Sequence, residues 1–240
     1  MKLKVLTKYA RKLLPLKHCG AVIVAAGNAS RMGGIDKIMA PLNGEPMIVR
    51  TVCAFQNCDV IKEIVVVTRA DLVETLMNLL AGFDKVRAVV SGGADRPASV
   101  RAGLNALSKQ VRLVAIHDGA RPLITDAVID RTVRAANSYG AAAPAVPVKD
   151  TVKVVKGGIV RATPDRNALQ AVQTPQVFDV DLLRGALRKA KLDGASITDD
   201  CSAVENMGMS VKIVEGDERN IKITTQTDLQ IARLMLEEIR

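Results

Sequence analysis

The sequence predicts an α/β fold with a doubly wound, mostly parallel β-sheet. Five short apolar runs are rich in Val, Ile and Ala and nearly continuous, which is typical of parallel strands covered on both faces. Segments with helical periodicity separate these runs, and repeated strand–helix units favour a parallel sheet that binds ligands at the carboxyl ends of its strands. A chain of 240 residues, 48% of them hydrophobic, is long enough to form one such domain.

The expected strands and helices alternate along the first 147 residues. Pro46 and Pro97 each fit the first turn of a helix, where the missing N–H of proline has no intrahelical partner to lose. The expected strands cover residues 21–25, 64–68, 86–90, 113–117 and 141–146, and the expected helices cover 46–55, 71–81, 97–108 and 126–138.

The alternation ends after Pro147, where a β-hairpin is predicted. Its strands, 150–155 and 159–162, flank Lys156-Gly157-Gly158, and paired glycines supply the positive φ that a tight turn needs. We expect this hairpin to project and to pack against a second subunit as a dimerisation arm. A simple excursion on the same sheet is the alternative. The chain then returns through residues 173–176, and we expect helices at 180–190 and 199–206, a strand at 211–214 and a closing helix from Thr227.

The domain organisation that follows is simple. Residues 19–240 are predicted to form a single domain, within which 148–169 are the β-arm. Residues 1–18 form a basic, partly amphipathic extension without the apolar core or cleavage site of a secretory signal. We expect an exposed surface helix there; a start-site extension or a weak contact with a membrane surface are the alternatives. No stretch is long and apolar enough to predict a membrane span, so no membrane partner is expected.

Composition and charge narrow the functional classes. The net charge of +9 predicts an anionic partner, but Lys and Arg are spread along the chain, which favours small phosphorylated substrates over nucleic acid. Aromatic residues make up only 2% of the chain, too few for a platform that stacks single-stranded nucleic acid. The four cysteines form no C-x-x-C pair and only two histidines are present, so we expect no zinc site and a cytoplasmic protein with reduced thiols.

The first predicted strand leads into a loop suited to phosphate. The small residues Ala25, Ala26 and Gly27 allow backbone N–H groups to approach a polyanion closely. Arg31 and Lys37 follow six positions apart, and such fixed cations stabilise the charge that develops during phosphoryl or nucleotidyl transfer. The loop lacks the Gly-Lys-Ser/Thr of an ATPase P-loop and the G-x-G-x-x-G of a dinucleotide-binding loop. ATPase and dehydrogenase activities are therefore disfavoured.

Two further loops follow predicted strands. In the first, Gly92 and Gly93 allow backbone atoms to meet a planar base, close to Asp95, and Ser99 lies where its hydroxyl can bond a ligand. In the second, Asp118 is predicted to reach the same sheet edge as the phosphate loop. Its carboxylate is suited to hold Mg²⁺ directly or through water, or to accept a hydrogen bond from a substrate hydroxyl.

The residues near Asp118 receive separate interpretations. Arg121 is expected to pair with Asp118 or with phosphate. His117 is expected to be structural, because a phosphate nucleophile needs no general base at neutral pH. Thr198 and Asp199 would each make a good helix N-cap, so a ligand contact there is no more favoured than a cap.

In combination, the motifs of residues 19–240 resemble those of the 2-C-methyl-D-erythritol 4-phosphate cytidylyltransferase family. The motifs are A-A-G-x-x-x-R-M, G-G-x-x-R-x-x-S-V, H-D-x-A-R-P, P-V-x-D-T-x-K, D-R-x-x-L, T-P-Q-x-F, T-D-D-x-S-x-V-E and N-I-K-I-T. The resemblance implies a Rossmann-like nucleotidyltransferase fold, transfer of CMP from CTP to the methylerythritol phosphate, Mg²⁺ held mainly through the CTP phosphates, and a homodimer.

The resemblance also implies roles for individual residues. Arg31 and Lys37 would stabilise the transition state. Thr151 and Arg166 would reach the acceptor site from the neighbouring subunit's arm. The CTP-binding residues would be Ala25, Ala26, Gly27, Gly93 and Ser99, and the acceptor-binding residues would be Asp118, Arg121, Thr151, Arg166, Thr174, Thr198 and Lys222.

Three alternatives remain open at this point. A ribitol-5-phosphate cytidylyltransferase would share the fold and the chemistry. A catalytically silent nucleotide-binding protein would share only the fold, although the intact set of Arg31, Lys37, Asp118 and Lys222 disfavours it. Nucleic-acid binding through the basic N-terminal segment is the third and least favoured.

Overall fold

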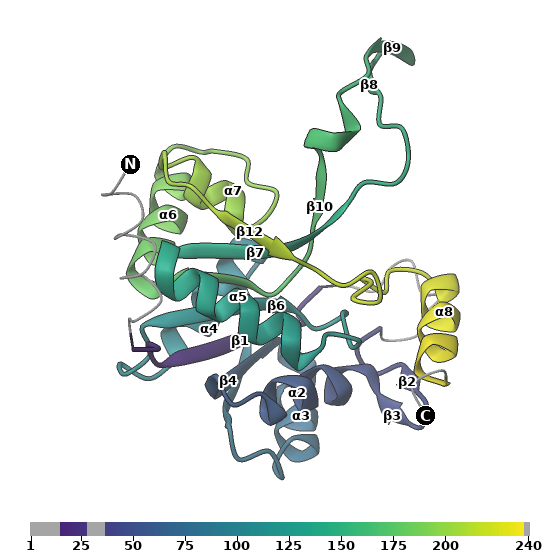
Figure 1. The fold of residues 1–240 in the computed structure, drawn as a ribbon. Helices are drawn as coiled ribbons and strands as arrows, with labels where there is room; N and C mark the ends of the chain where they lie inside the picture. Colours follow the sequence, from purple (N-terminus) through teal and green to yellow (C-terminus); the bar gives the residue numbers. More distant parts are fainter. Residues whose placement is uncertain (1–14, 28–36, 238–240) are drawn as a thin grey trace.

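A computed structural model of the protein describes residues 15–27 and 37–237, and these form a three-layer α/β domain (Figure 1). The main sheet has the strand order β10-β7-β11-β6-β1-β4-β5, and β12 also pairs with β7. Its strands are β1 (Cys19–Val24), β4 (Ile61–Thr68), β5 (Val86–Ser91), β6 (Leu113–Asp118), β7 (Ala141–Pro147), β10 (Gln170–Val172), β11 (Gln176–Asp179) and β12 (Lys212–Glu215). The predicted doubly wound, mostly parallel sheet is confirmed.

Helices cover both faces of the sheet because the apolar strands send alternate side chains to opposite faces. Ala21 and Ile23 of β1 join one core cluster, whereas Val22 joins the other. The first face carries α2 (Met47–Asn57), α3 (Val73–Leu79) and α5 (Asp126–Tyr139), and the second carries α4 (Arg96–Ala106), α6 (Val180–Leu192) and α7 (Asp200–Glu205). Among the helices that the structure describes, none has the length and apolar character needed to span a bilayer.

A third, smaller apolar cluster lies at one edge of the domain. It packs α8 (Gln226–Glu237) against the short hairpin β2 (Pro41–Leu42) and β3 (Glu45–Pro46). Leu42, Ala120 and Ile223 meet in this cluster, so three segments that are distant in sequence are brought together. Figure 1 shows α8 beside β2 and β3.

The observed elements differ from the predicted ones at several places. The segment around 173–176 was expected to be a plain connection, but it leads from β10 into β11, and β11 lies antiparallel between β6 and β7. The predicted helix 71–81 divides into a 3₁₀ turn, η1 (Ala70–Leu72), and α3. Pro46 is the N-cap of α2 rather than part of its first turn.

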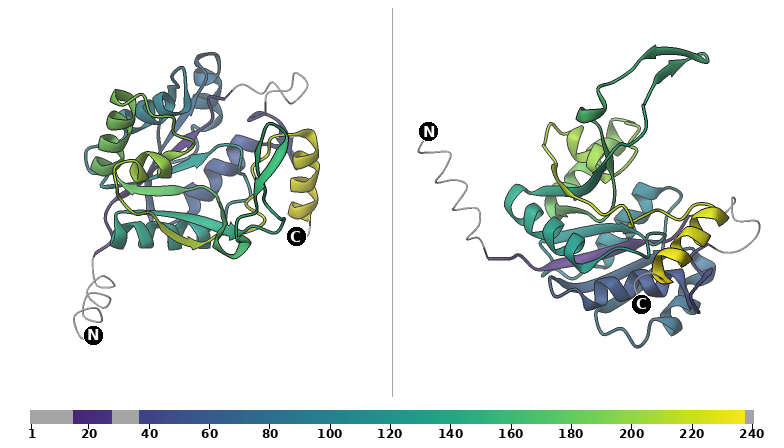
Figure 2. Two further views of the ribbon diagram at one scale, coloured as in Figure 1. Left: turned by 90° about the horizontal axis from the view of Figure 1, so that it is seen from above. Right: turned by 45° about the vertical axis from the view of Figure 1, so that its right-hand side comes forward.

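The hairpin after β7 consists of β8 (Val154–Lys156) and β9 (Ile159–Ala162), which pair with each other as a separate two-stranded sheet. Gly157 and Gly158 have φ of +59° and +77°, as the predicted turn requires. Its first strand is shorter than the predicted 150–155. The hairpin extends away from the main sheet in Figure 1 and in the right-hand view of Figure 2, and all of its residues are exposed.

The close packing of α4 on the sheet gives a test of the fold. A Cβ added at Gly103 of α4 would overlap Val22 and lie 2.9 Å from Cγ2 of Val67. We therefore expect Gly103→Ala to destabilise the protein by about 1–3 kcal/mol, measured as the free energy of unfolding in urea. Gly185→Ala in α6 is the matched control, because its Cβ would meet only Met207 at 3.8 Å and alanine favours the helix. Equal stabilities for the two variants would contradict the packing described.

Candidate active site

The candidate site lies where the strand order reverses, between β1 and β6. The chain runs from β1 outward through β4 to β5 and then returns to the other side of β1, and ligands bind at such switch points outside the carboxyl ends of the strands. Val24 and Asp118, the last residues of the two strands, are paired in register. A cleft of about 440 Å³ opens here, lined by Val24, Ala25, Ala26, Gly27, Lys37, Ile38, Gly93, Ala94, Asp95, Arg96, Ser99, Asp118, Ala120 and Lys222.

The glycine loop before α4 is shaped mainly by its own contacts. A Cβ at Gly92 would lie 2.6 Å from Cβ of Ala26 and 2.7 Å from Oγ of Ser99, so only glycine fits between the two loops. The backbone N–H of Gly93 donates to Oγ of Ser99 at 3.1 Å, and this hydroxyl donates to the carbonyl of Asp95 at 3.0 Å. The Asp95 carboxylate caps α4 through the N–H of Ala98. Ser99 and Asp95 therefore hold the loop in shape.

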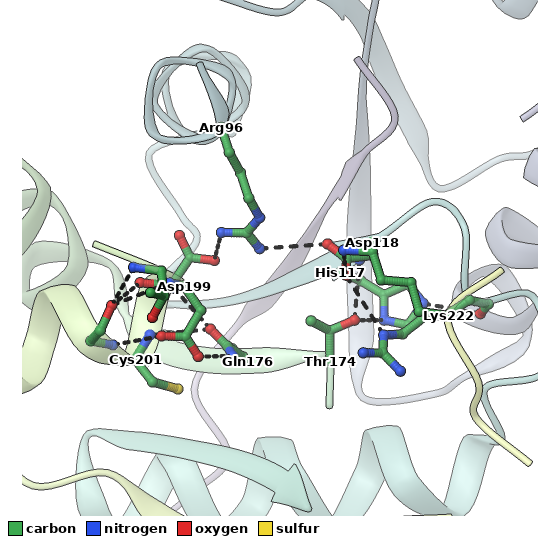
Figure 3. Close-up of polar contacts among 12 residues, drawn as sticks. Arg96, His117, Asp118, Thr174, Gln176, Asp199, Cys201 and Lys222 are labelled. Atoms are coloured by element: carbon green, nitrogen blue, oxygen red, sulfur yellow. Dashed lines mark hydrogen bonds and ion pairs between the residues drawn. The ribbon is translucent and has the colours of Figure 1, made fainter. Parts of the chain in front are cut away.

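Asp118 is the centre of charge in the site. Its carboxylate lies 2.9 Å from Nζ of Lys222, 3.6 Å from Nε of Arg121 and 3.6 Å from Nη2 of Arg96. Burial alone would raise the pKa of this carboxyl, but Lys222 and Arg96, with Arg121, outweigh burial and lower it to about 2. Asp118 is thus ionised at any physiological pH and holds three cations from separate parts of the chain (Figure 3).

His117 and Thr174 fix the backbone at Asp118. The N–H of Asp118 donates to Oγ1 of Thr174 at 3.1 Å, and the same hydroxyl lies 3.0 Å from Nδ1 of His117. Nε2 of His117 lies 3.2 Å from the carbonyl of Arg121. Burial lowers the pKa of His117 to about 4, so the ring is neutral at pH 7 and donates from Nε2 while Nδ1 accepts. His117 is structural, as expected.

The segment before α8 carries Lys222 to the site. The side-chain amide of Asn220 is buried and donates to the carbonyl of Thr174 at 2.9 Å, while the backbone carbonyl of Asn220 accepts from Nη1 of Arg121 at 2.7 Å. The N–H of Ile223 donates to the carbonyl of Ala120 at 2.9 Å. These bonds and the third apolar cluster fix the position of Lys222 relative to Asp118.

Lys37, a further cation that lines the cleft, is placed by the segment before β2. Backbone bonds join Ile38 and Ala40 to the start of α2: Ile48 N–H donates to the carbonyl of Ile38, and Met47 N–H to that of Ala40, each at 3.0 Å. Both residues are also buried. Lys37 thereby reaches the cleft directly after the segment 28–36.

The structure brings most of the predicted site residues together. Nine line the cleft: Ala25, Ala26, Gly27, Lys37, Gly93, Asp95, Ser99, Asp118 and Lys222. Three further predicted residues contact residues of the cleft lining: Gly92, Arg121 and Thr174. The Thr174 hydroxyl bonds the N–H of Asp118 and Nδ1 of His117. Arg31 lies outside the described residues.

The remaining predicted residues lie elsewhere in the subunit. Thr151 and Arg166 are exposed on the segments that flank the hairpin, where Arg166 Nη1 donates to the carbonyl of Lys149 at 2.8 Å. Thr198 is exposed before α7, and its N–H donates to Oγ of Ser202. Asp199 is the N-cap of α7 in a capping box with Ser202, which agrees with the N-cap interpretation.

Sequence reasoning missed Arg96 as a site residue. It lines the cleft and Nη1 donates to Oδ2 of Asp200 at 2.7 Å. The motif G-G-x-x-R contained it, but a motif does not show which of its members face a ligand. Gln176 and Asn220 were also missed as supporting residues, because their hydrogen-bond partners are 23 to 47 positions away along the chain.

The residues at Asp118 do not fit direct binding of Mg²⁺. Within residues 15–27 and 37–237, no group of three or more His, Cys, Asp or Glu side chains is arranged to hold a metal ion. Three cations already surround the Asp118 carboxylate, and a divalent cation there would have to displace them or lie against them. The prediction of a metal ligand at Asp118 is therefore not supported by its surroundings.

Comparison with known proteins identifies the family. Residues 19–238 match the family model described as IspD, 2-C-methyl-D-erythritol 4-phosphate cytidylyltransferase. The chain belongs to this family. A cytidylyltransferase of that name from Symbiobacterium thermophilum is 48% identical over 90% of this chain and 92% of its own length. Another from Caldanaerobacter subterraneus is 46% identical over 92% of this chain and its entire length.

Solved structures in the cytidylyltransferase family agree with the fold. The 4-diphosphocytidyl-2C-methyl-D-erythritol synthase of Anaerococcus prevotii superposes with a TM-score of 0.85 at 32% identity, over 93% of this chain and all of that one. The Francisella tularensis 2-C-methyl-D-erythritol 4-phosphate cytidylyltransferase gives a TM-score of 0.77 at 30% identity, over 91% of this chain and 99% of that one.

The buried neutral histidine predicts a pH dependence of stability. An unfolded His117 takes up a proton near pH 6.5, whereas the folded one does so near 4. Between these values the unfolded state binds more protons, so stability falls as the pH is lowered. We expect the free energy of unfolding to fall by about 2 kcal/mol from pH 7 to pH 5, measured in urea. His117→Gln should flatten this dependence, and an unchanged slope in that variant would contradict the assignment.

Proposed function

We propose that the protein transfers CMP from CTP to 2-C-methyl-D-erythritol 4-phosphate, giving 4-diphosphocytidyl-2-C-methyl-D-erythritol and pyrophosphate. Its family membership supports this reaction. The observation that carries the proposal is the cleft at the switch point, where a small-residue loop meets Lys37 and the Asp118–Lys222 pair. The curated relatives carry the methylerythritol name, which favours this acceptor over ribitol 5-phosphate.

In this reaction an oxygen of the acceptor phosphate attacks the α-phosphorus of CTP. The new P–O bond forms as the bond from the α-phosphorus to the bridging oxygen breaks, and pyrophosphate leaves with that electron pair. The reaction needs no protein nucleophile and no general base, in accord with the buried, neutral His117. The protein supplies position and charge: N–H groups of the loop 25–27 for the triphosphate, and Lys37 for the charge that develops on it.

The acceptor is proposed to lie against Asp118 and Lys222. The ionised carboxylate is suited to accept from hydroxyl groups of the polyol, and Lys222 is suited to hold its phosphate. Arg121 is proposed to stabilise the charge of Asp118, with which it forms an ion pair. Arg31 is assigned to transition-state stabilisation by its place in the motif alone.

Mg²⁺ is proposed to be needed and to arrive with CTP, bound to phosphate oxygens rather than held by a cage of protein ligands. When bound, it would reduce the negative charge of the triphosphate. The arrangement at Asp118 and the lack of a ligand cluster in the described ranges support this division of roles.

We further propose that the protein is a homodimer joined through the hairpin arm. The arm exposes an apolar surface that its own subunit does not cover: Val152, Val154, Val155, Ile159 and Val160 are 39–60% exposed. Thr151 and Arg166 lie on the same arm and would enter the partner's cleft. A cytoplasmic location is proposed from the four cysteines, all of them free thiols. Nucleic-acid binding is not proposed.

A pyrophosphate-release assay tests the function. Four nucleoside triphosphates are crossed with methylerythritol phosphate and ribitol 5-phosphate, in the presence and absence of Mg²⁺. We expect release only with CTP, methylerythritol phosphate and Mg²⁺ together. Release with ribitol 5-phosphate alone would overturn the acceptor, and no release with any pair would favour a catalytically silent nucleotide-binding protein.

Arg166→Ala tests the role of the arm. We expect the KM for methylerythritol phosphate to rise roughly 10- to 100-fold and the KM for CTP to change little, because one charged hydrogen bond to the acceptor phosphate is lost. Arg161→Ala, an exposed arginine on β9 of the same hairpin, is the matched control and should leave both constants unchanged. Equal effects on the two substrates would remove Arg166 from the acceptor site.

Co-expression of two impaired chains tests whether the arm serves the partner. A heterodimer of Arg166→Ala and Lys222→Ala chains contains one complete site, formed by the cleft of the first and the arm of the second. The heterodimer, purified through two different tags, should therefore show a kcat/KM for methylerythritol phosphate well above that of either homodimer. No such increase would show that the arm serves its own subunit.

A further inference from the structure

We infer that Arg96 is a further substrate-contacting cation of the cleft, directed at the acceptor phosphate, and that the buried Asp200 is the positioning residue that aims it. This inference rests on the proposed function. The sequence motifs contain both residues but assign a role in the site to neither. The two are 104 positions apart in sequence and meet because α4 and α7 lie on the same face of the sheet.

Asp200 is an unusual residue in this fold. It is only 1% exposed, and carboxylates are almost never fully buried without a partner. Its partner is Arg96, whose Nη1 donates to Oδ2 at 2.7 Å. Burial raises the pKa of Asp200, and the Arg96 guanidinium opposes that rise. The arginine is 29% exposed, so the buried end of the pair is the anion and the end at the cleft is the cation.

The position of Asp200 is fixed from below by β11. Oε1 of Gln176 accepts from the N–H of Asp200 at 3.0 Å and from that of Cys201 at 3.1 Å. Nε2 of the same amide donates to Oδ2 of Asp199 at 2.6 Å, and Asp199 caps the helix. Figure 3 shows this cluster on one side of Arg96 and Asp118 on the other. Asp200 is therefore held by a residue of the central sheet, Gln176, rather than by a residue of a loop.

The guanidinium of Arg96 lies between two carboxylates and keeps donors for a ligand. Nη1 is used by Asp200, while Nη2 lies 3.6 Å from Oδ1 of Asp118, too far for a hydrogen bond. Within residues 15–27 and 37–237, the bond to Asp200 is the only hydrogen bond of this guanidinium that the structure shows. A guanidinium has five N–H donors in a planar fork that suits phosphate.

The geometry points to the acceptor rather than the nucleotide. Arg96 approaches Oδ1 of Asp118 while Lys222 contacts Oδ2, so the two cations flank one carboxylate. Lys222 is proposed to hold the acceptor phosphate. Arg96 lies beside the same carboxylate and is therefore assigned to the same phosphate. A buried ion pair is weak evidence for a role in stability, since apolar residues of similar volume often serve as well. Placing a charge with a fixed orientation at a binding surface is a function that apolar residues do not provide.

A double-mutant cycle tests this inference, with kcat and both KM values measured by pyrophosphate release. Arg96→Gln should lower kcat/KM for methylerythritol phosphate roughly 100-fold and Asp200→Asn roughly 10-fold, with KM for CTP within about threefold. Adding Asp200→Asn to Arg96→Gln should lower kcat/KM no further, because Asp200 acts only through Arg96. Asp179→Asn is the matched control: this N-cap of α6 pairs with Lys17 at 2.9 Å, away from the cleft.

Two outcomes would overturn the inference. One is that Asp200→Asn lowers kcat/KM for methylerythritol phosphate less than twofold. The other is that Asp200→Asn lowers it by the same factor in the Arg96→Gln background as in the parent protein. If Asp200→Asn does not fold, Arg96→Lys replaces it, since it keeps the charge at the cleft surface and loses the fork; an unchanged kcat/KM would then overturn the inference. If the parent protein releases no pyrophosphate, the proposed function fails first. In that case the affinity for inorganic phosphate, measured by calorimetry, tests Arg96 separately. Equal affinities of the parent and Arg96→Gln would overturn the role of Arg96.

Discussion

The site depends on one ionised carboxylate, that of Asp118 at the end of β6. Without it, Lys222, Arg96 and Arg121 would repel one another within a cleft that is partly closed to water. With it, each cation has a fixed position, and each comes from a different part of the fold: the segment before α8, the first turn of α4 and the loop after β6. The strand pairing of β6 with β1 places this anchor beside the phosphate loop.

The charge balance of the site explains why an anion is favoured there. Among the charged residues that line the cleft, the three cations Lys37, Arg96 and Lys222 outnumber the two carboxylates Asp95 and Asp118. The carboxylates do not cancel the attraction for phosphate; they hold the cations in place while the cleft is empty. A phosphate that enters finds donors already oriented, and little reorganisation is needed during the reaction.

The sequence allowed the parallel core to be predicted but not its antiparallel insertion. Strands β1, β4, β5, β6 and β7 are apolar runs with an unambiguous pattern, and each was placed within a few residues. Strand β11 has only four residues, begins with Gln176 and ends at the N-cap of α6, so no periodicity marks it. The same limit applies to the site. The loops were found, but the sequence did not show that the hydroxyls of Ser99 and Thr174 bond within the protein, nor that Arg96 meets Asp200.

The insertion of β11 has a consequence for the chemistry. Gln176 pairs with Ile116 in the antiparallel register, which continues to set Thr174 opposite Asp118, and the hydrogen bond between them follows this register. Gln176, two residues later, holds the start of α7 and therefore Asp200. One short segment thus fixes both carboxylates that flank Arg96. Because β11 is hydrogen-bonded on both sides, to β6 and β7, a shift of either carboxylate would require breaking the centre of the sheet. The orientation of the Arg96 guanidinium is accordingly a property of the sheet rather than of the loops around the cleft.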